Sequence, residues 1–98
     1  MDAAVSLFRG LADPTRLALL QLLAAGEARV VDLTRQLDLA QSTVSGHLAC
    51  LRDCGLVAAR PEGRQMFYSI SRPELAVLIA AAERLLEATG WQVALCPV

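Results

Sequence analysis

Residues 38–72 read DLAQSTVSGHLACLRDCGLVAARPEGRQMFYSISR, and this stretch decides the fold. Its first part predicts a helix from Gln41 to Cys54, because apolar side chains recur there at the spacing of one helix face. These side chains are Val44, Leu48 and Leu51. Gly55 follows and supplies the left-handed residue that commonly ends a helix.

The first turns of this helix carry slim, polar side chains, namely Gln41, Ser42, Thr43 and Ser45. A helix that is polar at its start and anchored by apolar residues further on is suited to entering the major groove of DNA end-on. We therefore predict that these residues face double-stranded operator DNA. Gln41 is the best candidate for a base contact, because its amide matches the hydrogen-bonding edge of adenine.

After Gly55 the pattern changes to that of two short strands, 57–60 and 65–70, joined through Pro61-Glu62-Gly63-Arg64. Pro and Gly favour a turn at this place. The sequence thus predicts a β-wing over about 57–70, with Arg60 and Arg64 flanking its tip. Both arginines are predicted DNA-binding residues, and Arg64 would reach a flanking phosphate or the minor groove.

Helices are also predicted at 3–11, 14–25 and 30–37, and a last one over about 72–89, with 27–29 as a short connection and 90–98 as a tail. Asp13 is placed to cap the second helix, since Pro14 suits the first helical position. Ser71-x-x-Glu74 is placed to form a capping box for the last helix. The expected order, four helices, two strands and a helix, is a mainly α winged helix-turn-helix.

Ninety-eight residues form one expected domain, 1–98. A hydrophobic content of 55% is more than so small a domain can bury, so part of this surface is expected in an oligomer interface. The last helix has a broad apolar face made of Leu75, Leu78, Ile79, Ala82, Leu85 and Leu86. We predict a homodimer that associates through the first and last helices.

The charge and the remaining composition exclude several classes of function. A net charge of −1, from nine Arg and no Lys against ten acidic residues, argues against a non-specific polyanion binder but not against a groove reader. We see no signal peptide and no apolar run of about 20 residues, so a cytoplasmic protein without a membrane partner is expected. One His, no Ser-His-acid grouping and no phosphate-binding glycine loop indicate that the chain is not an enzyme.

Three segments together resemble the ArsR/SmtB family of metal-responsive bacterial repressors: ADPTRLALLQLL (12–23), STVSGHLACLRDCGLV (42–57) and EGRQMFYSI (62–70). The run C-L-R-x-C-G-L and a late cysteine are similar to the cadmium- and lead-sensing CmtR branch. The resemblance implies a homodimeric repressor that binds its operator when metal-free and releases it on binding metal. Matched by position, it implies DNA-facing roles for Gln41, Ser42, Thr43, Ser45, His47 and Arg64, and thiolate ligand roles for Cys50, Cys54 and Cys96.

The chain also departs from the family pattern. Residues 27–32 lack the cysteines of the arsenic and cadmium branches, and the last helix has Glu74, Glu83 and Glu87 but none of the histidines of the zinc sensors. Ala40 stands where relatives often have a capping Ser, a loss of ~1 kcal/mol if nothing replaces it.

The spacing of Cys50 and Cys54 favours a metal over a disulfide between them. Residues four apart on a helix have Cβ atoms roughly 5–6 Å apart, whereas a disulfide needs about 3.5–4.5 Å. Cys96 is the obvious third thiolate, from the same subunit or from the partner, and His47 is either a fourth ligand or, as we prefer, a DNA contact. Three thiolates suit soft ions, so we expect Cd(II) or Pb(II) before Zn(II), with As(III) as an alternative.

Three other interpretations stay open at this point. Cys50 and Cys54 are buried, small hydrophobic residues in the simplest one. A thiol-redox switch would pair Cys96 with one of them, although Cys54 at a helix C-terminus is not expected to be an activated thiolate. In the third, the chain is a dimer that keeps the fold without binding DNA.

Overall fold

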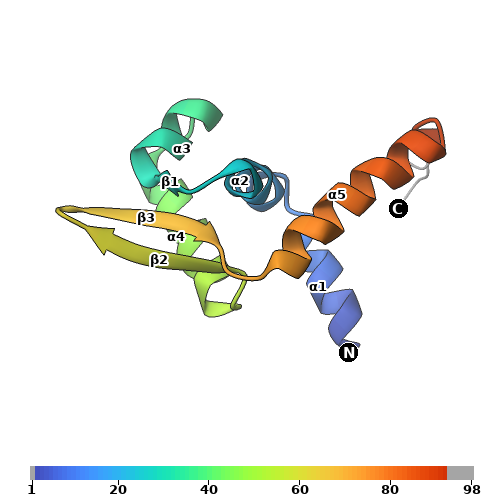
Figure 1. The fold of residues 1–98 in the computed structure, drawn as a ribbon, viewed down its shortest axis with the longest axis horizontal. Helices are drawn as coiled ribbons and strands as arrows, with labels where there is room; N and C mark the ends of the chain where they lie inside the picture. The colour runs from blue at the N-terminus through green and yellow to red at the C-terminus, as the bar shows by residue number, and fades with distance from the viewer. Residues whose placement is uncertain (1, 93–98) are drawn as a thin grey trace.

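A β-hairpin wing projects at one end of the molecule and the long last helix extends at the other, with the helix-turn-helix on the same side of the view as the wing (Figure 1). The computed structural model describes residues 2–92, over principal extents of 45 × 29 × 22 Å. Its elements follow in chain order: α1 (Ala3–Leu11), α2 (Pro14–Ala25), β1 (Ala28–Arg29), α3 (Val30–Leu37), α4 (Gln41–Asp53), β2 (Val57–Glu62), β3 (Gln65–Ile70) and α5 (Pro73–Ala88). The predicted winged helix-turn-helix is confirmed.

The sheet corrects two of the sequence-based predictions. Residues 27–29 were expected to be only a connection, but Ala28 and Arg29 form a strand antiparallel to β3, so the strand order is β1-β3-β2. A strand of two residues is too short to show alternation in the sequence. Pro61 and Glu62 were expected in the turn but lie in β2, where they pair with Met66 and Gln65. Pro is tolerated on β2 because β2 is an edge strand, which makes no ladder hydrogen bonds on its outer side.

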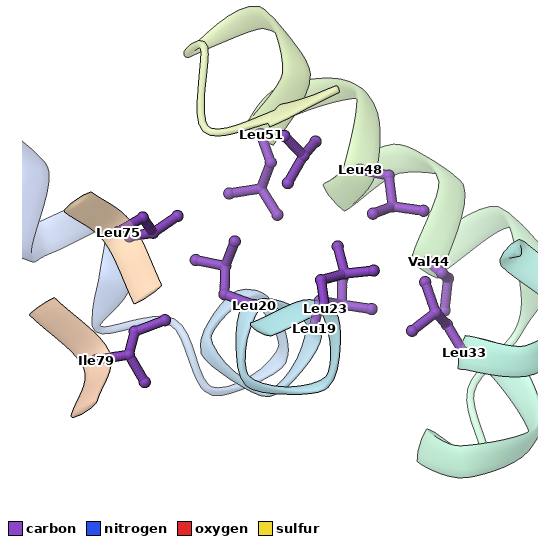
Figure 2. Packing of buried hydrophobic residues seen from close by; sticks show 10 residues of the cluster. Leu19, Leu20, Leu23, Leu33, Val44, Leu48, Leu51, Leu75 and Ile79 are labelled. Atoms are coloured by element: carbon purple, nitrogen blue, oxygen red, sulfur yellow. The ribbon is translucent and has the colours of Figure 1, made fainter. Parts of the chain in front are cut away.

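The hydrophobic core lies where α2 meets α4 and α5 (Figure 2). The predicted apolar stripe of α4 is confirmed, since Val44 and Leu48 are fully buried and Leu51 is 3% exposed. The α2 side of the core is made of Leu19, Leu20 and Leu23, and α5 adds Leu75 and Ile79. The helix that carries the predicted DNA-facing residues is therefore held along its whole length.

The two predicted helix caps have different outcomes. Asp13 caps α2 as predicted, because its carboxylate accepts hydrogen bonds from the amides of Thr15 (2.9 Å) and Arg16 (3.0 Å). The capping box at Ser71 is wrong: Arg72 is the N-cap of α5 and makes no side-chain cap bond. The Ser71 hydroxyl instead donates to the carbonyl of Gly55 at 2.5 Å. Ser71 thus joins the start of α5 to the residue that follows α4 and its cap.

The helices predicted to form the dimer interface leave apolar side chains uncovered in the single protomer. Helix α1 has no buried residue, and Phe8 on it is 56% exposed. On α5, Val77 and Leu85 are 63% and 60% exposed. Within residues 2–92, no helix has the length and apolar character needed to cross a membrane.

Candidate functional site

The start of α4 presents the polar side chains that the sequence predicted to face DNA. Gln41, Ser42 and Thr43 are exposed, and Ser45 and His47 are half-buried. They share the helix with the buried Val44 and Leu48, so the polar residues are held on a fixed support. The preceding helix α3 ends at Leu37, its C-cap Asp38 adopts a left-handed conformation with φ +53°, and only two further residues separate Asp38 from α4. The arrangement is that of a helix-turn-helix whose second helix offers its N-terminal turns to a ligand.

The wing arginines differ in their surroundings. Arg64 lies in the turn between β2 and β3 and has no ion-pair partner among residues 2–92. Arg60 lies within β2, and its guanidinium forms ion pairs with Glu27 at 2.6 Å and Glu62 at 2.9 Å. Its cationic carbon also lies 5.0 Å from the centre of the Phe67 ring. Arg64 is therefore the wing arginine that is available to a phosphate.

A further arginine with several side-chain contacts, Arg29, was not singled out from the sequence. Arg29 pairs with Asp32 at the start of α3, with 2.9 Å between the guanidinium and the carboxylate, and it also donates to the Gln65 amide oxygen on β3 at 3.0 Å. Hydrogen bonds from the side chain and the backbone amide of Arg29 lower the pKa of Asp32 to about 2 from 3.8. The only signal for this pair in the sequence is the spacing of three residues, which is common on helices.

The predicted thiol pair lies at the opposite end of α4. Cys50 and Cys54 are both free and both exposed, which excludes their interpretation as buried core residues. They line a pocket of about 380 Å³ between the C-terminal half of α4 and α1. The other residues around it are Ala3, Ser6, Leu7, Gly10, Arg16, Leu51 and Leu56. The pocket gives a ligand access to both thiols.

The environment of the thiols agrees with the expectation that Cys54 is not an activated thiolate. Desolvation by the surrounding residues raises the pKa of the Cys54 thiol, and the neighbouring Cys50 and Asp53 raise it further. Arg16, which the sequence did not single out, opposes these effects with its charge. Its Nε donates to the Gly10 carbonyl on α1 at 2.9 Å, which holds the guanidinium beside the pocket.

The described residues supply two of the three predicted thiolates. Within residues 2–92, no group of three His, Cys, Asp or Glu side chains is close enough to share a metal ion. His47 therefore does not complete the site with Cys50 and Cys54 in this part of the chain. Cys96 lies outside the described residues. Two exposed thiols one helical turn apart fit a thiophilic ion that takes further donors from elsewhere.

The family model and the similar proteins point to the same family of regulators. A family model described as "Bacterial regulatory protein, arsR family" matches residues 13–59. The chain is 43% identical over 84 residues to the "Probable mercury resistance operon repressor" of Streptomyces lividans, covering 86% of this chain and 67% of that protein. It is 47% identical over 75 residues to the transcriptional regulator CmtR of Mycobacterium tuberculosis, covering 76% of this chain and 64% of CmtR. The match thus spans about two thirds of these relatives' length.

Solved structures agree with the fold. The reduced form of HlyU from Vibrio cholerae superposes with a TM-score of 0.76 at 40% identity, covering 84% of this chain and 86% of that chain. A homodimeric winged helix-turn-helix DNA-binding domain from Mycobacterium bovis, a possible ArsR-family regulator, superposes with a TM-score of 0.74 at 31% identity. That alignment covers 89% of this chain and 87% of the other. The relatives described here are named as regulators rather than as enzymes.

Proposed function

The chain belongs to the ArsR family of bacterial regulatory proteins, and we propose that it is a metal-sensing transcriptional repressor. Its metal-free homodimer would bind operator DNA and release it when a thiophilic ion, Cd(II) or Pb(II), binds. The observation that carries this proposal is the arrangement of α4, which offers exposed polar residues at its first turns and two exposed thiols at its end. As a regulator of bacterial genes, it would act in the cytoplasm.

DNA binding is proposed through the first turns of α4 and the wing. In a two-fold dimer, the two α4 helices would enter successive major grooves about one helical turn apart. Gln41 would read a base, Ser42, Thr43 and Ser45 would contact phosphates or bases, and Arg64 would reach the flanking backbone. Half-buried His47 would contact DNA rather than metal. The homodimer itself is proposed through the uncovered apolar faces of α1 and α5, in keeping with the homodimeric neighbour from M. bovis.

The metal would be held by Cys50 and Cys54, with Cys96 as the third thiolate. The pair is exposed, which a ligand requires, and it lies at a pocket, which gives the ion a path to both sulfurs. Zinc–thiolate bonds are ~2.3 Å long. Two metal–sulfur bonds of about this length can bridge the gap between side chains four residues apart on a helix. Three soft donors favour Cd(II) or Pb(II) over Zn(II), and As(III) is the alternative that also takes three thiolates.

Hg(II) is a second candidate inducer. The relative from S. lividans is named for a mercury resistance operon. Hg(II) is a soft ion that is satisfied by two thiolates, the number that α4 supplies without the tail. The two candidates therefore differ in their need for Cys96: Cd(II) and Pb(II) would bind more weakly to Cys96→Ser, and Hg(II) would not.

The test is a cadmium titration of reduced protein followed by thiolate-to-metal absorption in the ultraviolet, in wild type and in three Cys→Ser variants. We expect saturation at one ion per subunit and intensity lower by about a third in Cys96→Ser, which keeps the thiol pair of α4. Cys50→Ser and Cys54→Ser break that pair and should bind cadmium more weakly, so they should show little absorption at the same cadmium concentration. His47→Ala is the matched control, since it should keep the full absorption while weakening DNA binding.

Operator release completes the test, measured by gel shift on the DNA upstream of the protein's own gene. A coupling of ~1–3 kcal/mol corresponds to operator affinity falling roughly 5–150-fold when metal binds. If Cys54→Ser releases DNA at the same cadmium concentration as wild type, the mechanism is wrong. Release by oxidant alone would favour the thiol-redox alternative, and no shift at any concentration would favour a dimer that does not bind DNA.

A further inference from the structure

The guanidinium of Arg60 is the most fully engaged polar group of the wing. Its Nε and one terminal nitrogen donate side by side to the two carboxylate oxygens of Glu27, at 2.7 and 2.6 Å. Its other terminal nitrogen donates to Glu62 at 2.9 Å. All three nitrogens of the guanidinium therefore donate to carboxylates, and its central carbon lies over the Phe67 ring.

These contacts make a poor binding site for a DNA phosphate. One guanidinium with two carboxylates has a local net charge of −1, which repels a phosphate instead of attracting it. A phosphate would also have to displace the paired hydrogen bonds to Glu27, and paired Arg–carboxylate bonds are among the stronger ones in proteins. The hydrogen bonds to Arg60 hold the pKa of Glu27 below its usual value, so this partner stays charged at neutral pH.

The Glu27 contact joins the wing to the body of the domain. Glu27 precedes β1 in the connection from α2, whereas Arg60 lies on β2. Arg29 and Arg60 are both cross-strand partners of Phe67, so the three side chains lie in one row on one face of the sheet. From β1, the Arg29 guanidinium donates a hydrogen bond to the Gln65 side chain on β3, so each strand of the wing has one side-chain contact with residues 27–29. The α2–α3 connection thus holds both strands of the wing by side chains as well as by the backbone of β1.

We propose that Arg60 is a positioning residue that holds the wing, and with it Arg64, at a fixed place relative to α4, and that it does not contact DNA. Glu27 is its partner in this role. The expected effect on operator affinity rests on the proposed DNA binding, whereas the Arg60–Glu27 ion pair does not. It changes the role of Arg60 from the one predicted from the sequence, where position near the wing tip was the only guide.

Glu27→Gln distinguishes the two roles by the sign of its effect, because it leaves Arg60 in place. If Arg60 positions the wing, Glu27→Gln weakens operator binding. If Glu27 merely competes with DNA for Arg60, the same change frees the arginine and tightens binding. Glu62→Gln is the matched control: it removes the same charge and also a partner of Arg60, but one that lies within the wing.

Operator affinity is measured by fluorescence anisotropy over a range of salt concentrations, on a duplex taken from upstream of the protein's own gene. An exposed ion pair in each protomer gives an expected weakening of up to about 25-fold per dimer for both Glu27→Gln and Arg60→Gln. The double variant should be no weaker than either single variant, and Glu62→Gln should stay near wild type. The slope of log affinity against log salt should change equally in Arg60→Gln and Glu27→Gln, because both variants release the same wing. If Arg60 itself held one phosphate in each protomer, the slope would be smaller by about a further 1.8 in Arg60→Gln alone.

Hydrogen exchange of the wing gives a readout that needs no DNA. Peptides covering 57–70 should exchange faster in Glu27→Gln than in Glu62→Gln, by up to about fivefold. Equal exchange in the two variants, tighter operator binding by Glu27→Gln, or a salt slope smaller by about 1.8 in Arg60→Gln than in Glu27→Gln would each overturn the proposal. If faster exchange is found in a protein that binds no operator, the contact stands and the proposed repressor function fails.

Discussion

Replacing Ala40 by Ser should stabilise the protein, because Ala40 occupies the N-cap of α4 without being able to cap it. Its backbone already has the extended conformation of a capping residue, with φ −65° and ψ 146°. Its carbonyl accepts the first helical hydrogen bond, from the amide of Val44 at 3.1 Å. No side chain caps the helix, so the amides of its first turn depend on solvent or a ligand.

The expected gain follows from these observations. A serine hydroxyl at this position can accept from the Thr43 amide without any change of backbone, and an N-cap Ser over Ala is worth ~1 kcal/mol, within a range of about 0.5–2. For a domain of this size, 1 kcal/mol raises Tm by roughly 4–8 °C.

Thermal unfolding followed by circular dichroism measures this, at one fixed protein concentration because dimerisation would shift Tm. Ala40→Val is the control, since it adds volume at the same place but no acceptor. An Ala40→Ser variant that melts no higher than wild type, or no higher than Ala40→Val, would refute the reasoning.

Three further predictions concern the core, the pH dependence and the proposed dimer. Leu48→Ala removes a fully buried side chain of α4 and should cost about 2–5 kcal/mol in urea unfolding, whereas exposed Gln36→Ala should change stability by less than about 0.5 kcal/mol. Because the pKa of Asp32 in the folded protein is about 2, below the usual value of 3.8, its contribution to stability is present above pH 3.8 and is lost as the pH falls toward 2. Asp32→Asn should therefore lower the urea midpoint at pH 6 and lose less stability than wild type between pH 4 and 2.5; equal losses would contradict the assignment. Leu85→Glu, at an uncovered apolar position of α5, should lower the dimer fraction in sedimentation equilibrium, while Met66→Glu on the wing should not.

The elements that could be predicted from the sequence are those whose determinants are local. Helix α4 was predicted because its apolar residues repeat at helical spacing, and the fully buried Val44 and Leu48 confirm it. Asp13 was recognised as a cap because a carboxylate before Pro14 acts on amides only two and three residues away. The polar start of α4 and its two thiols were found for the same reason, as both patterns lie within one helix.

The features that were missed depend on contacts between distant parts of the chain. Strand β1 exists because Ala28 and Arg29 meet β3, some 40 residues later, and no pattern within two residues reveals it. Arg60 and Glu27 are 33 positions apart, so neither the ion pair nor its effect on the role of Arg60 could be inferred from spacing. Ser71 satisfied the local rule for a capping box, but its hydroxyl bonds to Gly55, 16 residues earlier.

The packing of α4 limits how a metal at Cys50 and Cys54 can affect DNA binding. The distance along the helix from Gln41 to Cys50 is about 14 Å, and the buried Val44, Leu48 and Leu51 hold α4 against α2 over this span. A close-packed core does not allow the helix to slide by itself. In the proposed mechanism, the metal therefore has to act on neighbours of the thiols that are held less firmly.

Two such neighbours lead to the proposed dimer interface. Helix α1 lines the pocket at the thiols and has no buried residue of its own, so a ligand in the pocket can move it at little cost in core packing. Helix α5 is joined to the end of α4 by Ser71, whose hydroxyl bonds to Gly55 and whose amide bonds to Leu56 at 3.1 Å. Both routes connect the thiols to the helices that would meet the partner. Metal binding would then change the angle between two rigid protomers, and with it the spacing of the two α4 helices on DNA, without any change within either helix-turn-helix.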